Sequence, residues 1–183
     1  MKKIFVLSTI IIFSFSLVFA QNSVKYRADK AKTYITYSMS HPLHKWDATS
    51  KDVASVLVYN NDTKLIEKVA TAVPVSTFDS QNANRDSHMI EVVEGIKFPN
   101  VTFSSTSIIG TFDKMTITGT LDFHGVPKKI IFEASAKITD DGIEVNGAFN
   151  VKMSEFEIES PSLMGITTKD LIEIKFHSVY LFK

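Results

Sequence analysis

The chain has 183 residues, with 20 basic and 20 acidic side chains, and its formal net charge at pH 7 is zero. This balance excludes the strongly basic surface typical of nucleic-acid-binding domains, and it argues against attraction of the whole chain to an anionic membrane. The sequence contains no cysteine. We therefore expect no disulfide framework and no lipid-modified cysteine, and a fold that depends on its hydrophobic core.

The first twenty residues have the composition of a secretory signal peptide. Lys2 and Lys3 form a positively charged start, an apolar run covers residues 4–19, and Ala20 ends a small-residue cleavage pattern. The run is interrupted by serine and threonine and is short for a membrane-spanning helix. We expect cleavage after Ala20, a periplasmic or secreted protein without stable membrane insertion, and a single domain over residues 21–183. An uncleaved N-terminal anchor is the alternative.

Apolar and polar residues alternate at every second position over most of the sequence after residue 30, which predicts β-strands with one wet face. The predicted strands cover residues 33–39, 54–59, 67–75, 101–107, 114–123, 128–137, 143–153 and 172–177. Turn sequences at 124–127 and 140–142 predict hairpins, so the strands that they join run antiparallel. Residues 84–94 lack the alternation and predict a short helix that ends at Gly95.

About eight such strands must bring their apolar faces together, either as a two-layer sandwich or as a sheet closed into a barrel. Strand periodicity alone does not distinguish these two arrangements. An antiparallel barrel of eight strands has an interior that is filled by side chains or that holds one small ligand. The sequence therefore predicts an all-β fold whose interior decides the function.

The side chains at the apolar, alternate positions of the predicted strands define the predicted interior. A filled core is the simpler interpretation, because apolar faces more often pack against protein than against a ligand. Gly119 and Gly147 remove side-chain volume from this face, and its methionines offer adaptable surface, which favours a cavity. The candidate wall residues are Ile35, Tyr37, Met39, Met115, Ile117, Leu121, Phe123, Phe149, Val151, Met153, Ile172, Ile174 and Phe176.

Three segments, taken in chain order, resemble motifs of the YceI-like family of bacterial lipocalin-like, polyisoprenoid-binding proteins. Residues 75–80 followed by 84–89 (Asn-Arg-Asp-Ser-His-Met) are similar to the family's strand end that leads into an Arg-Asp-x-His-(Leu/Met) helix. Residues 98–103 are similar to its aromatic-Pro-x-(Ile/Val)-x-Phe strand start, and residues 119–129 to its Gly-x-Leu-x-x-x-Gly-Val-x-Lys hairpin. Residues 33–41 resemble the family's first strand, which ends on a histidine.

This resemblance implies an extended eight-stranded antiparallel barrel of lipocalin type, with one short helix near residues 84–94. It also implies a long apolar tunnel that holds a polyisoprenoid or isoprenoid-quinone chain, in a periplasmic or secreted carrier that is not an enzyme and needs no other cofactor. The chain departs from the family at residues 42–47, where Pro-Leu-His-Lys-Trp-Asp replaces the usual glycine and phenylalanine. We therefore expect the tunnel mouth to differ. The oligomeric state is left open, with a homodimer as one option.

His41 and His44, followed by Asp47, form a candidate metal site because histidine and aspartate are common metal ligands. The spacing is not specific, and His44 lies beyond a proline, so no regular element is expected to direct both imidazoles at one point. We favour hydrogen-bonded loop histidines at the barrel rim and expect no metal site.

Arg85, Asp86 and His88 stand close together at the start of the predicted helix and suggest an alternative function, a periplasmic enzyme with an acid–base cluster. We favour structural roles, because Asp86 suits a helix N-terminus and Arg85 can pair with a carboxylate or carbonyl group. Arg85 is also the residue expected to contact a phosphate or quinone headgroup. The sequence contains no Gly-x-Ser-x-Gly, phosphate-binding glycine loop or His-Glu-x-x-His motif. A third alternative is a filled barrel or sandwich that acts as an interaction or stress-protection module without a ligand.

Overall fold

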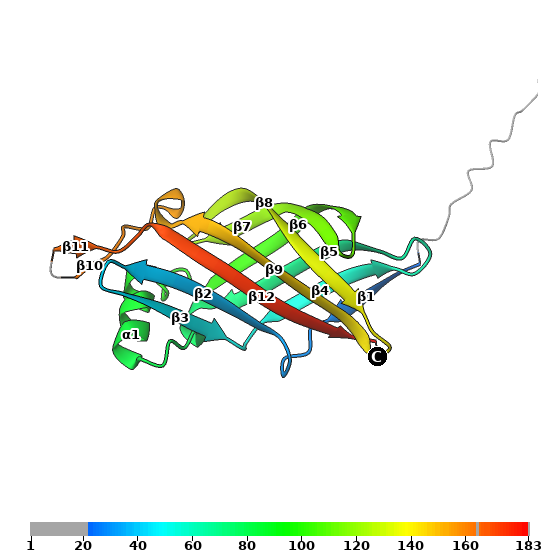
Figure 1. The fold of residues 1–183 in the computed structure, drawn as a ribbon, viewed down its shortest axis with the longest axis horizontal. Helices are drawn as coiled ribbons and strands as arrows, with labels where there is room; N and C mark the ends of the chain where they lie inside the picture. The colour runs from blue at the N-terminus through cyan, green and yellow to red at the C-terminus, as the bar shows by residue number, and fades with distance from the viewer. Residues whose placement is uncertain (1–21, 164, 183) are drawn as a thin grey trace, which may run out of the picture.

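The computed structural model describes residues 22–163 and 165–182, and the predicted signal peptide lies outside them. Ten of the described strands form one curled antiparallel sheet with a helix at one end (Figure 1), and two more form a separate short hairpin. The sheet strands are β1 (Ser23–Arg27), β2 (Tyr34–His41), β3 (His44–Ser50), β4 (Ala54–Asn60), β5 (Leu65–Pro74), β6 (Asn100–Thr111), β7 (Lys114–Phe123), β8 (Val126–Ile138), β9 (Gly142–Lys152) and β12 (Leu171–Leu181). The other elements are the helix α1 (Ala83–Val92), the short hairpin β10 (Ser162–Leu163) and β11 (Ile166–Thr167), and the 3-10 turns η1 (Val75–Thr77) and η2 (Met153–Phe156).

The sheet order is β1-β4-β5-β6-β7-β8-β9-β12-β2-β3, so consecutive hairpins build most of the sheet. Backbone pairing also brings the two sheet edges toward other strands. Ala28, directly after β1, pairs with Tyr180 in β12, and Thr49 in β3 pairs with Asp79, which follows β5. The Asp29 N–H donates to the Val179 carbonyl oxygen at 2.7 Å. These contacts curl the sheet into an elongated barrel.

The all-β class, the antiparallel arrangement and the short helix are confirmed, but the count of eight strands is wrong. The main sheet has ten strands, because β1 and β3 join the eight predicted ones. Pro42 and Leu43 form a two-residue turn that continues β2 directly into β3, in the segment predicted to be a loop. The inward positions of β3 include the small residues Ala48 and Ser50, which weaken its apolar alternation.

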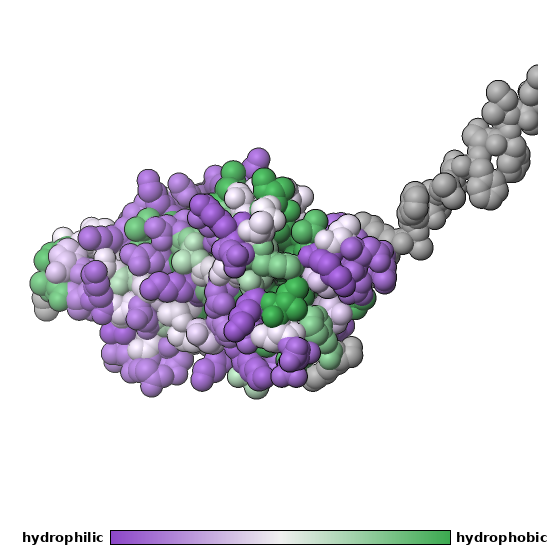
Figure 2. Space-filling model, turned by 45° about the vertical axis from the view of Figure 1, so that its right-hand side comes forward, coloured by the Kyte–Doolittle hydropathy of each residue, from purple (hydrophilic) through white to green (hydrophobic). Residues whose placement is uncertain are grey.

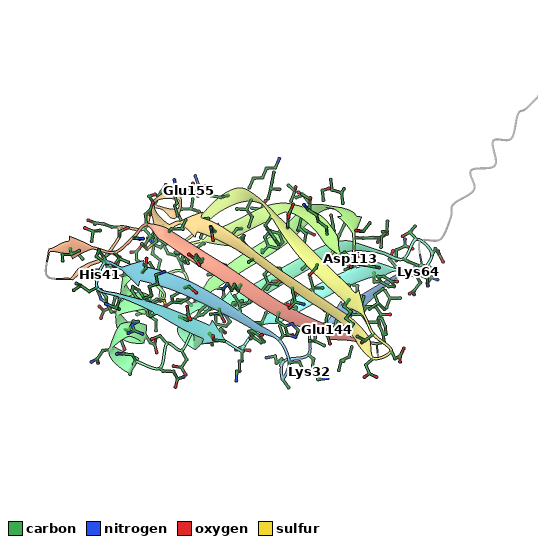
Figure 3. All side chains as sticks on the ribbon, in the orientation of Figure 1. Lys32, His41, Lys64, Asp113, Glu144 and Glu155 are labelled. Carbon is green, nitrogen blue, oxygen red and sulfur yellow. The ribbon has the colours of Figure 1, made fainter. Side chains whose placement is uncertain are left out.

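Two hydrophobic clusters occupy the two ends of the barrel. We call the end that carries α1 and the β2–β3 turn the helix end, and the opposite end the far end; Figure 3 labels His41 at the former and Lys64 at the latter. The far cluster includes Leu57, Met115, Ile143 and Tyr180, and the helix-end cluster includes Val75, Val93, Leu121, Val151 and Phe156. Members of both clusters, among them Tyr180 and Leu121, also line the interior cavity described below.

Candidate ligand-binding cavity

An elongated cavity runs inside the barrel from α1 to the end of β12. It encloses about 210 Å³ that the centre of a water molecule could occupy. Along β12 its wall uses every second residue from Ile172 to Tyr180, a path of roughly 25 Å at about 3.3 Å per strand residue. The cavity is therefore long and narrow, a shape suited to a chain rather than to a compact molecule.

The wall consists of the side chains that point into the barrel, at every second position of each strand, and it is almost wholly apolar. Its residues are Ile35, Tyr37, Met39, Trp46, Val69, Thr71, Val73, Val75, Phe78, Arg85, His88, Met89, Val92, Val93, Val101, Thr102, Phe103, Ile117, Leu121, Phe123, Phe132, Val145, Phe149, Val151, Met153, Pro161, Ile172, Ile174, Phe176, Ser178 and Tyr180. The few polar members offer too few hydrogen bonds for a polar ligand. Binding in this cavity would depend on apolar contact.

Several large wall residues point inward and yet remain only half-buried. Phe149, Ile174 and Phe176 are in this class, whereas Ile143 in the far cluster is 0% exposed. An inward side chain keeps accessible surface only when neighbouring side chains leave space beside it. The middle of this barrel is therefore open, unlike a filled core.

Four phenylalanine rings form the middle section of the wall. The Phe132 ring stacks on Phe149 with centroids 4.8 Å apart, and it contacts Phe103 at 5.4 Å and Phe176 at 5.9 Å. Gly119 lies under the Phe103 ring, and Gly147 lies under the Phe176 ring.

The two glycines make room for two of these rings. A Cβ atom on Gly119 would lie 2.4 Å from the Phe103 ring, and one on Gly147 would lie 2.5 Å from the Phe176 ring. Their missing side chains let the two rings lie against the sheet, so the volume that the glycines remove from the interior is used by these rings.

The helix α1 forms one boundary of the cavity where it opens. The Asn82 side chain caps the helix by accepting from the Arg85 N–H at 3.1 Å. Met89 and Val93 turn inward from the helix and line the cavity. His88 also lines it, and its side chain is 61% exposed, so the cavity reaches solvent beside α1.

A small polar cluster surrounds this mouth. The Arg85 guanidinium lies 5.4 Å above the centre of the Trp46 ring, and its Nη1 donates to the Ser80 carbonyl oxygen at 3.5 Å. Burial raises the pKa of Tyr37 to about 12, against a smaller opposing effect of the side-chain hydrogen bond from Trp46. Within the described residues no carboxylate forms an ion pair with Arg85, so its charge is available at the mouth.

A family model described as a YceI-like domain matches residues 26–180 of the sequence. The chain belongs to the YceI-like family. It is 28% identical to Protein YceI of Salmonella newport, in an alignment that covers 78% of this chain and 82% of that protein. Protein YceI of Salmonella agona is 29% identical over the same shares.

Solved structures of low sequence identity share the fold of this YceI-like chain. Burkholderia cenocepacia BcnA matches with a TM-score of 0.75 at 17% identity, covering 83% of this chain and 98% of that chain. A polyisoprenoid-binding domain from Saccharophagus degradans matches with a TM-score of 0.69 at 13% identity, and the match covers 90% of this chain and 100% of that domain. The Campylobacter jejuni YCEI protein matches with a TM-score of 0.62 at 18% identity, and the match covers 100% of this chain and 99% of that chain. These likenesses establish the architecture.

Most residues predicted from the strand parity meet in the YceI-like cavity. Every candidate wall residue lines it except Met115, which is 4% exposed and packs in the closed far cluster. Arg85 lies at the mouth. Contact of these residues with a ligand stays a prediction.

Other wall residues were missed, on β3, β5, η1, α1, β6, β8, β9 and β12. Trp46, Phe103 and Phe132 are among the largest of them. The alternation at 101–107 and 128–137 could have identified the two phenylalanines, because each occupies one of the apolar alternate positions of its strand.

The residues of the alternative enzyme hypothesis have separate partners. Both carboxylate oxygens of Asp86 accept from the Ser80 N–H, at 3.1 and 3.3 Å, which ties the helix start to the preceding loop. His88 Nδ1 lies 3.6 Å from a carboxylate oxygen of Glu91 on the helix surface. Arg85, Asp86 and His88 form no hydrogen bond or ion pair with one another in the described part of the chain.

His41 and His44 lie in regular elements, contrary to the expectation of a loop. They pair across the two-residue turn between β2 and β3, and their ring centroids are 5.5 Å apart. His41 is 4% exposed; its Nε2 donates to the Ile166 carbonyl oxygen at 3.0 Å, and its Nδ1 accepts from the Leu43 N–H at 3.3 Å. Among residues 22–163 and 165–182, no three potential metal ligands of the histidine, cysteine or carboxylate type cluster together.

No helix within the described residues is long and apolar enough to cross a membrane.

Proposed function

We propose that this YceI-like chain is a non-catalytic carrier that holds a long apolar lipid, of polyisoprenoid or isoprenoid-quinone type, inside the barrel. The observation that carries this proposal is the long cavity with an almost wholly apolar wall. At roughly 0.8 kcal/mol per buried CH₂, ten carbons contribute roughly 8 kcal/mol, which corresponds to about micromolar affinity before ordering costs. The fold likeness to a polyisoprenoid-binding domain supports the same class of ligand.

A non-catalytic role agrees with the separate partners of Arg85, Asp86 and His88 described above. An acid–base mechanism needs groups within hydrogen-bonding reach of one another or of a shared reacting atom. Here Asp86 holds a loop and His88 faces Glu91. The polar groups at the mouth suit ligand orientation better than chemistry.

Export fits a carrier of this kind. The predicted signal peptide would direct the chain to the periplasm or the exterior, with cleavage after Ala20. An isoprenoid chain is insoluble in such an aqueous compartment and needs an apolar container to leave a bilayer. Location and cavity therefore support the same role.

The protein has one tryptophan, Trp46, and its side chain lines the cavity, so tryptophan fluorescence reports directly on this site. Farnesol and longer polyprenols should change this fluorescence on binding, with tighter binding for the longer chains. Ile174→Phe places a ring in the narrow cavity and should weaken binding about tenfold, equivalent to about 1.4 kcal/mol.

Ile131→Phe is the matched control, because Ile131 is 63% exposed on β8 and the same substitution there leaves the cavity unchanged. Equal affinity of both variants for each polyprenol, or no fluorescence change at any concentration, would contradict the carrier function.

Arg85 is the residue proposed to contact a charged or quinone headgroup. Its guanidinium lies at the mouth over Trp46 without an ion pair to any described carboxylate. Arg85→Ala should therefore weaken binding of farnesyl diphosphate by about ten- to a hundredfold, as expected for loss of one charge-assisted contact of about 1.5–3 kcal/mol. Farnesol should bind the variant as it binds the wild type. Equal losses for both ligands would show that Arg85 acts on the chain or on the fold.

A further inference from the structure

The cavity wall ends before the far end of the barrel is reached. The wall residue nearest the far end is Tyr180 on β12, Val145 on β9 and Ile117 on β7. The next inward residues in that direction are Ile143 on β9 and Met115 on β7, and both pack in the far cluster without lining the cavity. The barrel therefore continues beyond the cavity, and the cavity has a floor at the level of Tyr180.

The Tyr180 side chain forms this floor on the side where the sheet closes. Its hydroxyl lies 2.7 Å from the Ser55 hydroxyl on β4, and the Ser55 hydroxyl lies 2.8 Å from the Thr71 hydroxyl on β5. The ring therefore reaches from β12 to β4, across the joint at which Ala28 pairs with Tyr180. Because these bonds hold both ends of a buried side chain, the ring has a fixed position at the floor.

The far cluster fills the barrel at and beyond this floor. Leu57 and Ile143 are both 0% exposed, and Ile66 and Ala136 are also buried. Figure 2 turns the far end toward the viewer and shows coloured side chains packed over it. Within the described residues the cavity is therefore closed at the far end, and it reaches solvent beside α1.

The charged groups of the wall lie at the opposite end from the floor. Among the wall residues that the structure describes, Arg85 and His88 are the only basic side chains, no carboxylate is present, and both residues lie on α1. The floor hydroxyls of Ser55, Thr71 and Tyr180 already pair with one another. A hydrocarbon end therefore suits the floor, and a polar headgroup suits the mouth.

The distance from the mouth to the floor decides how much of a chain the cavity can enclose. The wall path of roughly 25 Å along β12 corresponds to about 20 Å along the barrel axis, given the strand tilt of about 35–45° that is typical of barrels. An isoprene unit adds four main-chain bonds of about 1.5 Å each, or about 5 Å in extended form. The path from the mouth to Tyr180 therefore matches about four isoprene units.

We propose that Tyr180 limits the isoprenoid chain that the barrel encloses to about four units, or about twenty carbons. The hydrocarbon end of the lipid meets the Tyr180 ring, and a longer lipid leaves its further units outside the mouth. The gain in affinity from each added unit ends where the chain fills the cavity. This inference rests on the carrier function and specifies the chain length that the carrier selects.

The first test raises the floor by one substitution. Val145→Phe places a ring beside Ser178, its partner on β12, and shortens the cavity. Titration of Trp46 fluorescence compares each variant with the wild type for the same prenol, so that differences in prenol solubility cancel. Val145→Phe should weaken binding of geranylgeraniol, which has four units, about tenfold more than binding of geraniol, which has two.

Ile131→Phe is again the matched control, because it introduces the same ring on the outside of β8. Its affinity should equal that of the wild type for both prenols. Equal losses for geraniol and geranylgeraniol in Val145→Phe would overturn the length limit, because a floor affects only the chains that reach it.

The second test removes the floor ring itself. Tyr180→Leu should raise the affinity for a prenol of five units relative to geranylgeraniol by about threefold or more, since the chain can then extend toward Ser55. Tyr180→Phe loses the same hydrogen bond but keeps the ring, so its preference between the two prenols should match that of the wild type. The pair of variants thus separates chain length from lost stability.

The outcomes distinguish the length limit from the carrier function. The same preference between the two prenols in Tyr180→Leu and Tyr180→Phe would overturn the role of Tyr180, while prenol binding by the wild type would leave the carrier function intact. A wild type that binds no prenol of any length would contradict the carrier function, and the length limit with it.

Discussion

The apolar surroundings of Tyr37 raise the pKa of its phenol group. Its side chain is 8% exposed, and burial raises its pKa from 10.0 to about 12. The folded protein therefore holds the phenolic proton at a pH where the unfolded chain releases it. The stability that neutral Tyr37 contributes is complete below pH 10 and is lost as the pH rises from 10 to about 12.

Tyr37→Phe should remove this contribution to the pH dependence. We expect the free energy of unfolding of the wild type to fall more steeply above pH 10 than that of the variant. Burial also raises the pKa of Tyr180, but this residue is present in both proteins and does not affect the comparison. Urea denaturation across this pH range measures both slopes. Parallel slopes would show that Tyr37 is not the group responsible.

At the residue scale, the sequence predicted which side chains point inward but not what they contact. The alternation identifies Ile35, Phe149 and Ile174 as inward because the side-chain period of a strand is two. It does not show that Phe176 covers Gly147, because that contact depends on how β12 pairs with β9. Met115 obeys the same alternation as the cavity residues, and its position near the far end places it in the closed core.

The strands β4 and β12 are far apart in the sheet order, and a side-chain network joins them through the barrel interior. The Ser55 hydroxyl lies 2.7 Å from the Tyr180 hydroxyl and 2.8 Å from the Thr71 hydroxyl of β5. Tyr180 is 1% exposed, so water cannot replace a lost partner. Together with the Ala28–Tyr180 backbone pair, this network closes the far end.

Tyr180→Phe and Ser55→Ala should each lower the free energy of unfolding by about 1–3 kcal/mol, since each leaves a buried hydroxyl short of a partner. The double variant should lose less than the sum of the two, because both changes break one shared hydrogen bond. Urea denaturation of the three variants gives this coupling. Tyr34→Phe, at a tyrosine that is 43% exposed, is the control and should change stability by less than about 0.5 kcal/mol. Strictly additive losses would exclude the closing role of the pair.

At the element scale, strands with strong apolar alternation were predictable and weak ones were not. β7 and β9 have strong alternation and were identified with ends correct to within one residue, whereas β12, predicted to end at residue 177, continues to Leu181. β1 has five residues, and β3 places small side chains inward, so local sequence distinguished neither from a loop. Both are edge strands whose pairing comes from tertiary structure.

The whole molecule is an apolar container that we propose is exported into water. A ligand that binds only the folded state stabilises it, by about 2.7 kcal/mol when its free concentration is a hundred times the dissociation constant. Protein stripped of lipid by organic extraction and refolded should therefore unfold at a lower temperature than protein as purified, and added polyprenol should restore the difference.

Mass spectrometry of the protein under native conditions, after purification from its own host, tests the carrier function most directly. The predicted spectrum shows a chain that lacks residues 1–20 and carries an additional mass, which organic solvent releases as a lipid built from isoprene units. The Ile174→Phe variant, prepared in the same way, should carry less of this lipid than Ile131→Phe. A spectrum that contains only the ligand-free chain, with no lipid in the solvent extract, would contradict the proposal.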